Sequence, residues 1–234
     1  MTSAVVLQGF AGRHNGATMT LDLFPDLATP RWTDPLADGA VVLRGFAMDW
    51  EAALLSALQE VIKQAPLRQM VTPGGRTMSV TTTSCGGLGW VSDAIGYRYS
   101  SVDPLNGHLW PGMPAAFSDL ATAAAEAAGY ADFRPDACLI NCYVPSARMT
   151  LHQDRNERDF AQPIVSVSLG LPATFQFGGE QRADPTLRVP LAHGDVAVWG
   201  GPARLRFHGV LPLKPGLHPR LGARRINLTF RKAG

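Results

Sequence analysis

The second part of the chain contains short runs of β-forming residues that are separated by turn residues. Seven such runs cover residues 137–143, 164–169, 174–177, 188–191, 196–199, 204–210 and 225–230. Short strands at near-regular spacing are typical of an all-β sandwich or barrel. The sequence therefore predicts a β core for residues 136–234.

Helical patterns precede these strands. Apolar residues recur at helical spacing over Trp50–Ala65, where Asp49 is the expected N-cap. An alanine-rich run, Pro114–Ala128, predicts a second helix that ends at Gly129. Helices followed by strands predict an α+β fold in which the helices buttress one sheet. Two further strands are expected at 41–43 and 77–83.

Composition limits the class of protein. Hydrophobic residues make up 46% of the 234 residues, and no apolar run reaches the ~18 residues that would cross a bilayer. Residues 1–18 lack the features of a signal peptide, and we expect them to form a flexible leader. The cysteines Cys85, Cys138 and Cys142 are too few for a disulfide scaffold, so we expect buried thiols. We expect a single domain over 19–234, a cytoplasmic location and a monomer.

The common nucleotide and hydrolase signatures do not occur in this sequence. There is no glycine-rich dinucleotide loop, no Walker A lysine loop and no G-x-S-x-G elbow. The net charge of +2 neither requires nor excludes a nucleic-acid partner. The histidines and carboxylates are therefore the main candidates for chemistry.

Two His-x-Asp pairs occur, His152–Asp154 and His193–Asp195. Side chains two residues apart on a strand lie on one face. Together with a distant second histidine, such a pair forms a ligand set that binds iron(II) and leaves coordination positions of the metal open. The second pair lies between two predicted strands and is typical of a turn. The first pair precedes a polar loop, and the strands that follow can bring His208 back to the same end. The spacing alone leaves structural roles equally open.

The last predicted strand places several polar residues on one face. Arg225, Asn227, Thr229 and Arg231 alternate along it. Two arginines on one face beside a metal can clamp the two carboxylates of a dicarboxylic acid.

A series of motifs carries a resemblance to a known family. They are RQMVTPGGRTMSV (68–80), CGGLGW (85–90), PDACLINCYVP (135–145), LHQD (151–154), PIVSVSLGLPATFQFGG (163–179), HGDVAVWGG (193–201) and INLTFRKAG (226–234). In this order they resemble the AlkB family, iron(II)- and 2-oxoglutarate-dependent dioxygenases that remove alkyl groups from nucleic-acid bases. The resemblance covers residues 19–234. It implies a double-stranded β-helix, or jelly roll, with buttressing helices and a nucleotide-recognition lid at 68–99.

The resemblance also implies roles for individual residues. The iron ligands would be His152, Asp154 and His208, and the residues that bind 2-oxoglutarate would be Asn141, Tyr143, Arg225, Asn227 and Arg231. Trp90 and His152 would sandwich the target base. Further contacts to alkylated DNA or RNA would come from Thr72, Arg76, Tyr97, Asn156, Glu157 and Arg182. O₂ would be the oxidant, and N1-methyladenine and N3-methylcytosine would be the substrates. Because no additional hairpin that could open a duplex is evident, single strands are favoured.

One position departs from the family pattern. Where the family commonly has an acidic residue facing the base, this chain has Asn156, followed by Glu157. Since N1-methyladenine and N3-methylcytosine are cationic, we expect weaker discrimination in favour of cationic bases, or a different ranking of the adenine and cytosine lesions, unless Glu157 compensates.

Other interpretations remain open. The same oxygenase chemistry could act on tRNA, a protein or a small molecule, and a jelly roll could bind a ligand without catalysis. Trp90 and Tyr97 with Arg68, Arg76 and Arg98 nearby in the sequence favour nucleic acid. Core packing is expected for Trp110 and Trp199.

Overall fold

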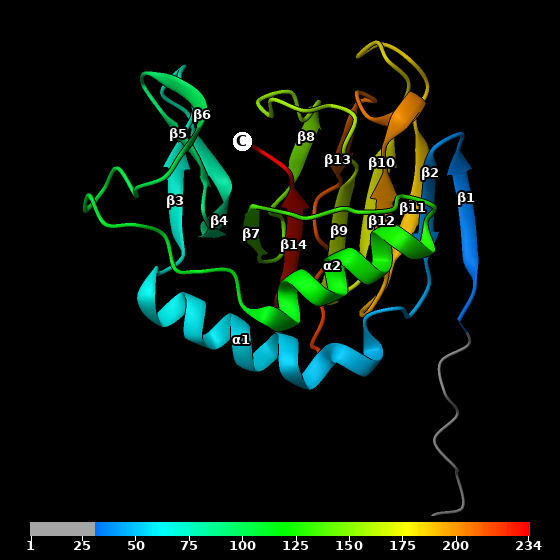
Figure 1. The fold of residues 1–234 in the computed structure, drawn as a ribbon, viewed down its shortest axis with the longest axis horizontal. Helices are drawn as coiled ribbons and strands as arrows, with labels where there is room; N and C mark the ends of the chain where they lie inside the picture. Colours follow the sequence, from blue (N-terminus) through cyan, green and yellow to red (C-terminus); the bar gives the residue numbers. More distant parts are fainter. Residues whose placement is uncertain (1–30) are drawn as a thin grey trace, which may run out of the picture.

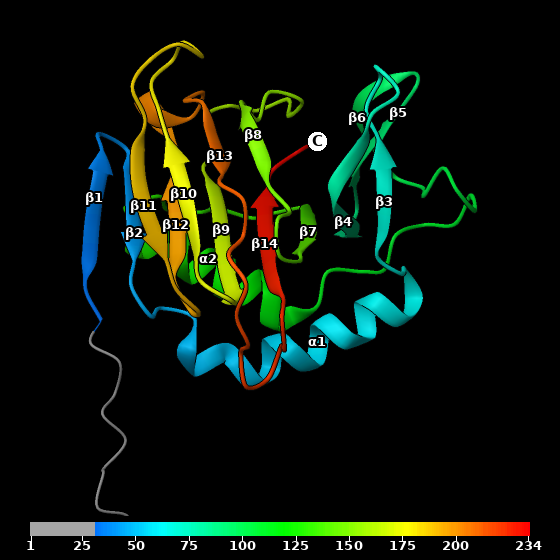
Figure 2. The ribbon, with the colours of Figure 1, turned by 180° about the vertical axis from the view of Figure 1, so that it is seen from behind.

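Two antiparallel sheets form the centre of the molecule (Figures 1 and 2). The computed structural model describes residues 31–234, so the leader expected at 1–18 lies outside the described residues. The larger sheet has eight strands, in the spatial order β1 (Thr33–Ala37), β2 (Ala40–Leu43), β12 (Val196–Trp199), β9 (Ile164–Gly170), β14 (Arg225–Arg231), β7 (Ala137–Tyr143), β4 (Thr77–Gly86) and β3 (Arg68–Val71). The smaller sheet has four strands, β11 (Leu187–Leu191), β10 (Ala173–Phe177), β13 (His208–Val210) and β8 (Met149–His152).

Six of the seven predicted strands of the β core are present with nearly the expected bounds. The seventh, expected over 204–210, is wrong for its first half, because only His208–Val210 is a strand. A short 3₁₀ helix, η2 (Gly201–Ala203), precedes it. The Arg204 side chain turns inward and donates to the carbonyls of Asp154 and Gln162. These contacts keep residues 204–207 from pairing with a neighbouring strand.

Two helices, α1 (Glu51–Gln64) and α2 (Ala115–Ala127), cover the outer face of the larger sheet (Figure 1). The expectation that Asp49 is the N-cap of α1 is wrong. A 3₁₀ turn, η1 (Met48–Trp50), leads into α1, so Trp50 takes the cap position, and Asp49 binds Arg31 instead. Gly129 follows α2 with a φ of +89°, a conformation that ends a helix at low cost only for glycine.

The buried side chains form two main layers. Between the helices and the larger sheet lie residues such as Leu54, Phe117 and Phe230. Between the two sheets lie the aromatic rings of Phe175, Phe177 and Trp199, among others. The expected core positions of Trp110 and Trp199 are confirmed, since their exposed fractions are 5% and 2%. All three cysteines are buried and free, as expected.

A two-hairpin segment lies at one edge of the larger sheet, whose last two strands belong to it (Figure 1). It consists of β3–β4 and of β5 (Gly89–Asp93) paired with β6 (Gly96–Ser100). The β5–β6 hairpin was not expected, because its glycine-rich sequence resembles a loop. The preference for single strands stays a prediction, because the presence of this hairpin does not test whether it opens a duplex.

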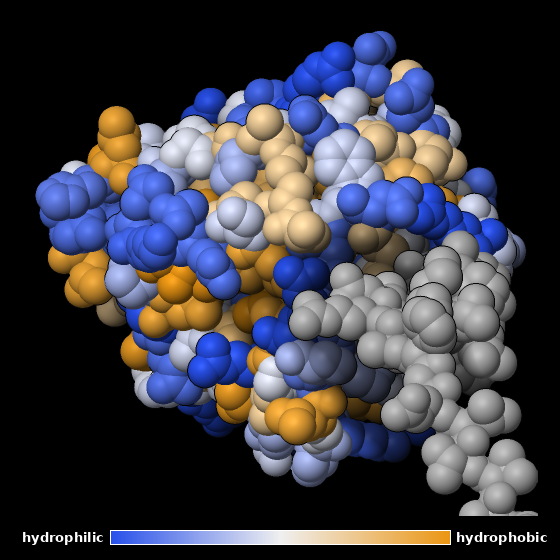
Figure 3. All heavy atoms as spheres, turned by 90° about the horizontal axis from the view of Figure 1, so that it is seen from below, coloured by the Kyte–Doolittle hydropathy of each residue, from blue (hydrophilic) through white to orange (hydrophobic). Residues whose placement is uncertain are grey.

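The face seen from the side of α1 shows hydrophobic residues in separate groups between hydrophilic ones (Figure 3). Within residues 31–234, no helix has both the length and the apolar character needed to cross a membrane.

Candidate active site

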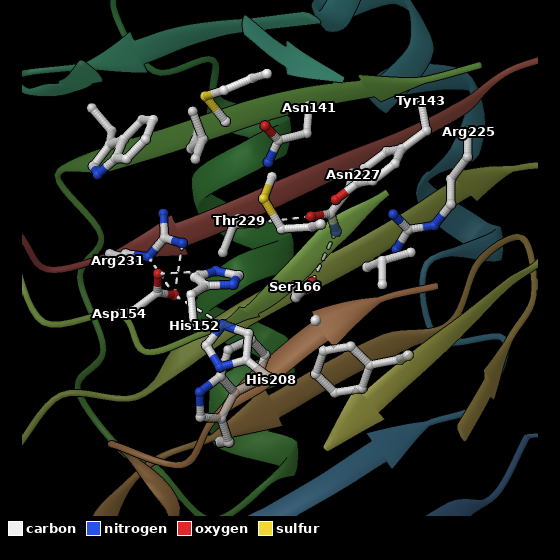
Figure 4. Close-up of a pocket in the computed structure, with 18 residues that line it drawn as sticks. Asn141, Tyr143, His152, Asp154, Ser166, His208, Arg225, Asn227, Thr229 and Arg231 are labelled. Carbon is white, nitrogen blue, oxygen red and sulfur yellow. Dashed lines mark hydrogen bonds and ion pairs between the residues drawn. The ribbon is translucent and has the colours of Figure 1, made fainter. Parts of the chain in front are cut away.

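The two sheets bring His152, Asp154 and His208 together at one end of the space between them (Figure 4). His152 ends β8 and His208 begins β13, and the two residues are paired in antiparallel register. Asp154 lies two residues after His152. Its Oδ1 is 3.8 Å from Nε2 of His152, and its Oδ2 is 3.6 Å from Nε2 of His208. One ligand atom from each residue lies within 4.8 Å of the others. This set fits a divalent metal ion with open coordination positions.

Backbone carbonyls orient both imidazole rings. Nδ1 of His152 lies 2.9 Å from the carbonyl of Thr150, and Nδ1 of His208 lies 3.0 Å from that of Arg206. A carbonyl only accepts, so each Nδ1 donates its proton, and the lone pair of the neutral ring lies at Nε2, on the side of Asp154. Burial and the neighbouring His208 lower the pKa of His152 to about 4, so this ring is neutral at pH 7. Both histidines are thus prepared to bind a metal.

Arg231 binds the carboxylate of Asp154. Its Nε and Nη2 donate to the same oxygen at 3.0 and 2.7 Å. Burial opposes ionisation of Asp154, but the charge of Arg231 holds the pKa of this carboxyl well below its usual value. The ligand is therefore an anion at neutral pH, and Arg231 adjoins the metal position.

Arg225 lies at the start of β14, buried against the Tyr143 ring (Figure 4). Its Nη2 donates to Oγ of Ser168 at 3.0 Å, whereas Nε and Nη1 have no hydrogen-bond partner within residues 31–234. Burial lowers the pKa of this guanidinium. A buried cation with two free donors fits a carboxylate ligand.

The stretch of β14 between the two arginines is polar on the same face. Asn227 donates to Ser166 Oγ at 2.8 Å and accepts from Thr229 at 2.9 Å. Across the strand pair, Oδ1 of Asn141 is buried without a partner among the described residues. These side chains line a cavity of about 90 Å³ together with Tyr143, His152, Asp154, His208, Arg225 and Arg231. The cavity thus offers unmatched polar atoms to a small anionic ligand between the metal position and Arg225.

Trp90 lines the same cavity from the β5–β6 hairpin. Its ring stacks on Tyr97 with 5.6 Å between ring centres and 16° between planes. Asn156 bridges the two, because its Oδ1 accepts from Trp90 Nε1 and its Nδ2 donates to the Tyr97 carbonyl, both at 3.5 Å. The structure thus brings three of the residues predicted to contact nucleic acid into one group, of which Trp90 lines the cavity.

Glu157 lies in a different environment from Asn156. It is buried, and its carboxylate accepts from Arg204 at 3.0 Å and from the hydroxyl of Tyr99 at 2.7 Å, with Arg231 at 3.4 Å. These partners occupy the carboxylate, so it is not free to supply the charge that Asn156 lacks.

Several predicted contacts lie outside the cavity. Arg182 donates to the Leu151 carbonyl at 2.5 Å and covers the Phe207 ring. Thr72 and Arg76 bind each other across the β3–β4 turn, where the Thr72 hydroxyl accepts from the Arg76 amide at 3.1 Å.

The arginines expected near nucleic acid differ in their availability. Arg68 forms a salt bridge with Asp103, and Arg98 forms one with Asp93. Within the described part of the chain, only Arg76 of these three has no ion pair.

Sequence reasoning missed Tyr99, Arg204 and the serines Ser166 and Ser168. The serines carried a usable signal, because they alternate with valines along β9 and so lie on one face. Tyr99 and Arg204 carried none, since their partners lie more than 40 residues away in the chain.

Comparison with known proteins agrees with this site. Residues 39–231 match the family model described as the 2OG-Fe(II) oxygenase superfamily. The alpha-ketoglutarate-dependent dioxygenase AlkB of Escherichia coli (strain K12) is 58% identical over 92% of this chain and 98% of its own length. The protein of the same name from Salmonella typhimurium is 57% identical over 91% of this chain and 98% of its own. The solved structure of OsALKBH1 matches with a TM-score of 0.74 and 28% identity, covering 86% of this chain and all of that one.

The jelly-roll sheets and the His-x-Asp…His site are those of a 2OG-Fe(II) oxygenase. The chain belongs to this superfamily and, within it, to the AlkB family. The expected cofactors, iron(II) and 2-oxoglutarate with O₂, follow from that membership and fit the donor set of the cavity.

Proposed function

We propose that this protein removes methyl groups from N1-methyladenine and N3-methylcytosine in nucleic acid, and so repairs alkylation damage directly. The observation that carries the proposal is the shared cavity, in which the base-stacking residue Trp90 and the metal-binding His152 line one space. Bound iron(II), 2-oxoglutarate and O₂ supply the oxidation of the N-methyl group, which leaves as formaldehyde while succinate and CO₂ form.

The residues of the chain bind and orient the reactants. His152, Asp154 and His208 hold the metal. Arg225 binds the distal carboxylate of 2-oxoglutarate. Because Arg225 is buried beside Tyr143, water is excluded and the ion pair is stronger. Asn141, Asn227 and Arg231 orient the rest of the cosubstrate.

The two-hairpin segment and the loop after β8 bind the nucleic acid, so residues 68–99 act as a lid. Trp90 and His152 hold the flipped base between two rings, and Asn156 positions Trp90. A base methylated on its pairing edge has lost its hydrogen bonds, so extruding it costs less than extruding a normal base. Arg76 and Tyr97 lie on the same segment, where they contact phosphate. Arg182, which donates to the Leu151 carbonyl, lines the base pocket.

The experiment uses purified protein with iron(II), ascorbate and 2-oxoglutarate. Short single-stranded oligonucleotides carry either methylated base, and mass spectrometry follows the loss of one methyl group. We expect methyl loss that requires 2-oxoglutarate and is abolished in His208→Ala.

His193→Ala is the matched control, because His193 belongs to the second His-x-Asp pair. It lies elsewhere, accepting from the Gly170 amide at 2.8 Å and pairing with Glu51. Turnover of 2-oxoglutarate without methyl loss from either oligonucleotide would refute the substrate class, and tRNA, proteins and small molecules would be tried next. Iron binding without any turnover would favour a non-catalytic binding module.

A further inference from the structure

Two hydroxyl groups on β4 are buried without a hydrogen-bond partner. Thr82 and Ser84 are both 0% exposed, and neither Oγ1 of Thr82 nor Oγ of Ser84 has a partner among the described residues. Because a buried hydroxyl without a partner is costly, nearly all such groups in proteins bond to the chain or to an ordered water molecule. Two of them on one strand therefore point to a common partner.

Both side chains face the space between the two sheets. Successive residues of a strand point to opposite faces. Val80 packs in the layer between the sheets, whereas Cys85 packs in the layer beneath the helices. Thr82 and Ser84 share the face of Val80, so they lie on the side of β4 that borders the cavity.

Asn141 lies directly across from Thr82. The two residues are paired in the antiparallel ladder of β4 and β7, where Ser84 is paired with Leu139. Paired side chains have Cβ atoms about 4.5–5.5 Å apart, and diagonal neighbours about 7–8 Å. Oδ1 of Asn141, which is also buried without a partner among residues 31–234, thus forms a triangle with the two hydroxyls. A triangle of this size fits one water molecule, since buried waters bond to about three otherwise unpaired groups.

The orientation of the Asn141 amide determines what it offers to the cosubstrate. A carboxylate only accepts hydrogen bonds, so it requires Nδ2 and would be repelled by Oδ1. In Figure 4, Nδ2 of Asn141 lies on the side of Asn227, and Oδ1 lies on the opposite side. A donor at Oδ1 keeps the amide in this orientation, and 2-oxoglutarate itself cannot supply that donor.

We propose that Thr82 and Ser84 hold one water molecule that donates to Oδ1 of Asn141 and so keeps Nδ2 turned toward 2-oxoglutarate. Each hydroxyl donates its proton to the oxygen of this water, and the water donates one of its own to Asn141. Thr82 and Ser84 are thus positioning residues, which act on the cosubstrate through Asn141. This inference rests on the proposed function, in which Asn141 orients 2-oxoglutarate.

The test compares Thr82→Val with Thr83→Val. Valine has nearly the shape of threonine but no hydroxyl, and the Thr83 hydroxyl points the other way, donating to the Ala65 carbonyl at 2.8 Å. Calorimetric titration of the iron(II)-loaded protein without O₂ measures the affinity for 2-oxoglutarate. We expect Thr82→Val to raise the dissociation constant about threefold to tenfold, the loss of roughly one hydrogen bond. Thr83→Val should lower the stability of the protein but leave this constant unchanged.

A double substitution separates positioning from a merely structural role. In the background of Asn141→Ala, Thr82→Val should change the affinity no further, because the amide that it positions is gone. Thr82→Ser keeps the hydroxyl and should retain most of the affinity. In turnover, Thr82→Val should raise the KM for 2-oxoglutarate and leave the KM for the oligonucleotide unchanged.

The water molecule itself is tested by crystallography. A crystal structure of the complex with iron(II) and 2-oxoglutarate should show a water oxygen within about 3.2 Å of both hydroxyls and of Oδ1 of Asn141. The same structure of Thr82→Val should lack it. A direct contact between Thr82 and Asn141 in place of the water would refute the shared site.

The outcomes separate this inference from the proposed function. If the unmodified protein does not demethylate either oligonucleotide, the proposed function itself fails. If Asn141→Ala weakens 2-oxoglutarate binding but Thr82→Val does not, the positioning role is refuted while the proposed function stands. The same holds if Thr82→Val weakens binding equally with and without Asn141.

Discussion

Arg204 and Glu157 form a buried ion pair beside the metal ligands. Nη2 of Arg204 lies 3.0 Å from Oε2 of Glu157, and only 3% and 2% of the two side chains are exposed. Arg204 also donates to the Asp154 carbonyl at 2.8 Å, and the Tyr99 hydroxyl donates to Glu157 at 2.7 Å. The pair thus connects the loop that carries a metal ligand to the β5–β6 hairpin.

Removing one partner of this pair should destabilise the protein strongly. Arg204→Met leaves the Glu157 carboxylate buried with fewer partners, which costs about 3–5 kcal/mol in the free energy of unfolding. Urea unfolding followed by circular dichroism measures the change. Lys63→Met removes the same charge from an exposed pair with Glu60 and should cost less than about 1 kcal/mol. Equal effects of the two substitutions would show that the buried pair has no special role.

Substitution of the two arginines of β14 should affect the stability of the metal-free protein differently. Arg225→Met removes a buried cation with two unpaired nitrogens, so the free energy of unfolding should stay equal or rise. Arg231→Met deprives Asp154 and Glu157 of a partner, so the free energy of unfolding should fall by about 3–5 kcal/mol. Both are measured by urea unfolding in the presence of a chelator.

The same Arg225 substitution should weaken 2-oxoglutarate binding. A hydrogen bond to a charged group is worth about 1.5–3 kcal/mol, so the affinity should fall at least about tenfold. Calorimetric titration of the metal-loaded protein checks this. Unchanged affinity in Arg225→Met would mean that the carboxylate binds elsewhere.

Asn156→Asp should change which bases are preferred. The new carboxylate would lie next to Trp90, where a cationic base is expected to stack. An ion pair in a partly exposed site is worth about 1 kcal/mol, so kcat/KM for the cationic bases relative to a neutral methylated base should rise about fivefold. Asn106→Asp adds the same charge on an exposed loop and serves as the control. If the ratios of all bases stay the same in Asn156→Asp, the residue does not set the preference.

The stability of the metal-free protein should fall as the pH is lowered from about 6.5 to 4. The folded state holds the pKa of His152 at about 4, below the usual value near 6.5. Between these values the unfolded chain binds a proton that the folded state does not, so acid favours unfolding. Urea unfolding at several pH values measures the slope. His152→Gln removes the imidazole and should flatten the slope. An unchanged slope would show that other residues cause the pH dependence of stability.

The strands β7, β9, β12 and β14 could be predicted because short runs of β-forming residues between turn residues are local signals. The β5–β6 hairpin could not, since its glycines also suit a loop, and pairing with a second strand decides between the two. The prediction of a strand over 204–210 was wrong in its first half for a related reason. Arg204 is held by partners in a distant loop, and these contacts override the local preference.

The types of residue in the site can be read from the amino-acid sequence: a His-x-Asp pair, a distant histidine, and arginines that alternate along the last strand. Which of these groups meet depends on the tertiary structure. The β8–β13 pairing brings His208 to His152 across 55 residues of chain, and it leaves the other His-x-Asp pair in a turn. Burial also decides which charges are matched, because Glu157 is enclosed by Arg204 while Arg225 keeps two free donors. Contacts between residues far apart in sequence depend on the whole packing of the sheets, and no local pattern encodes them.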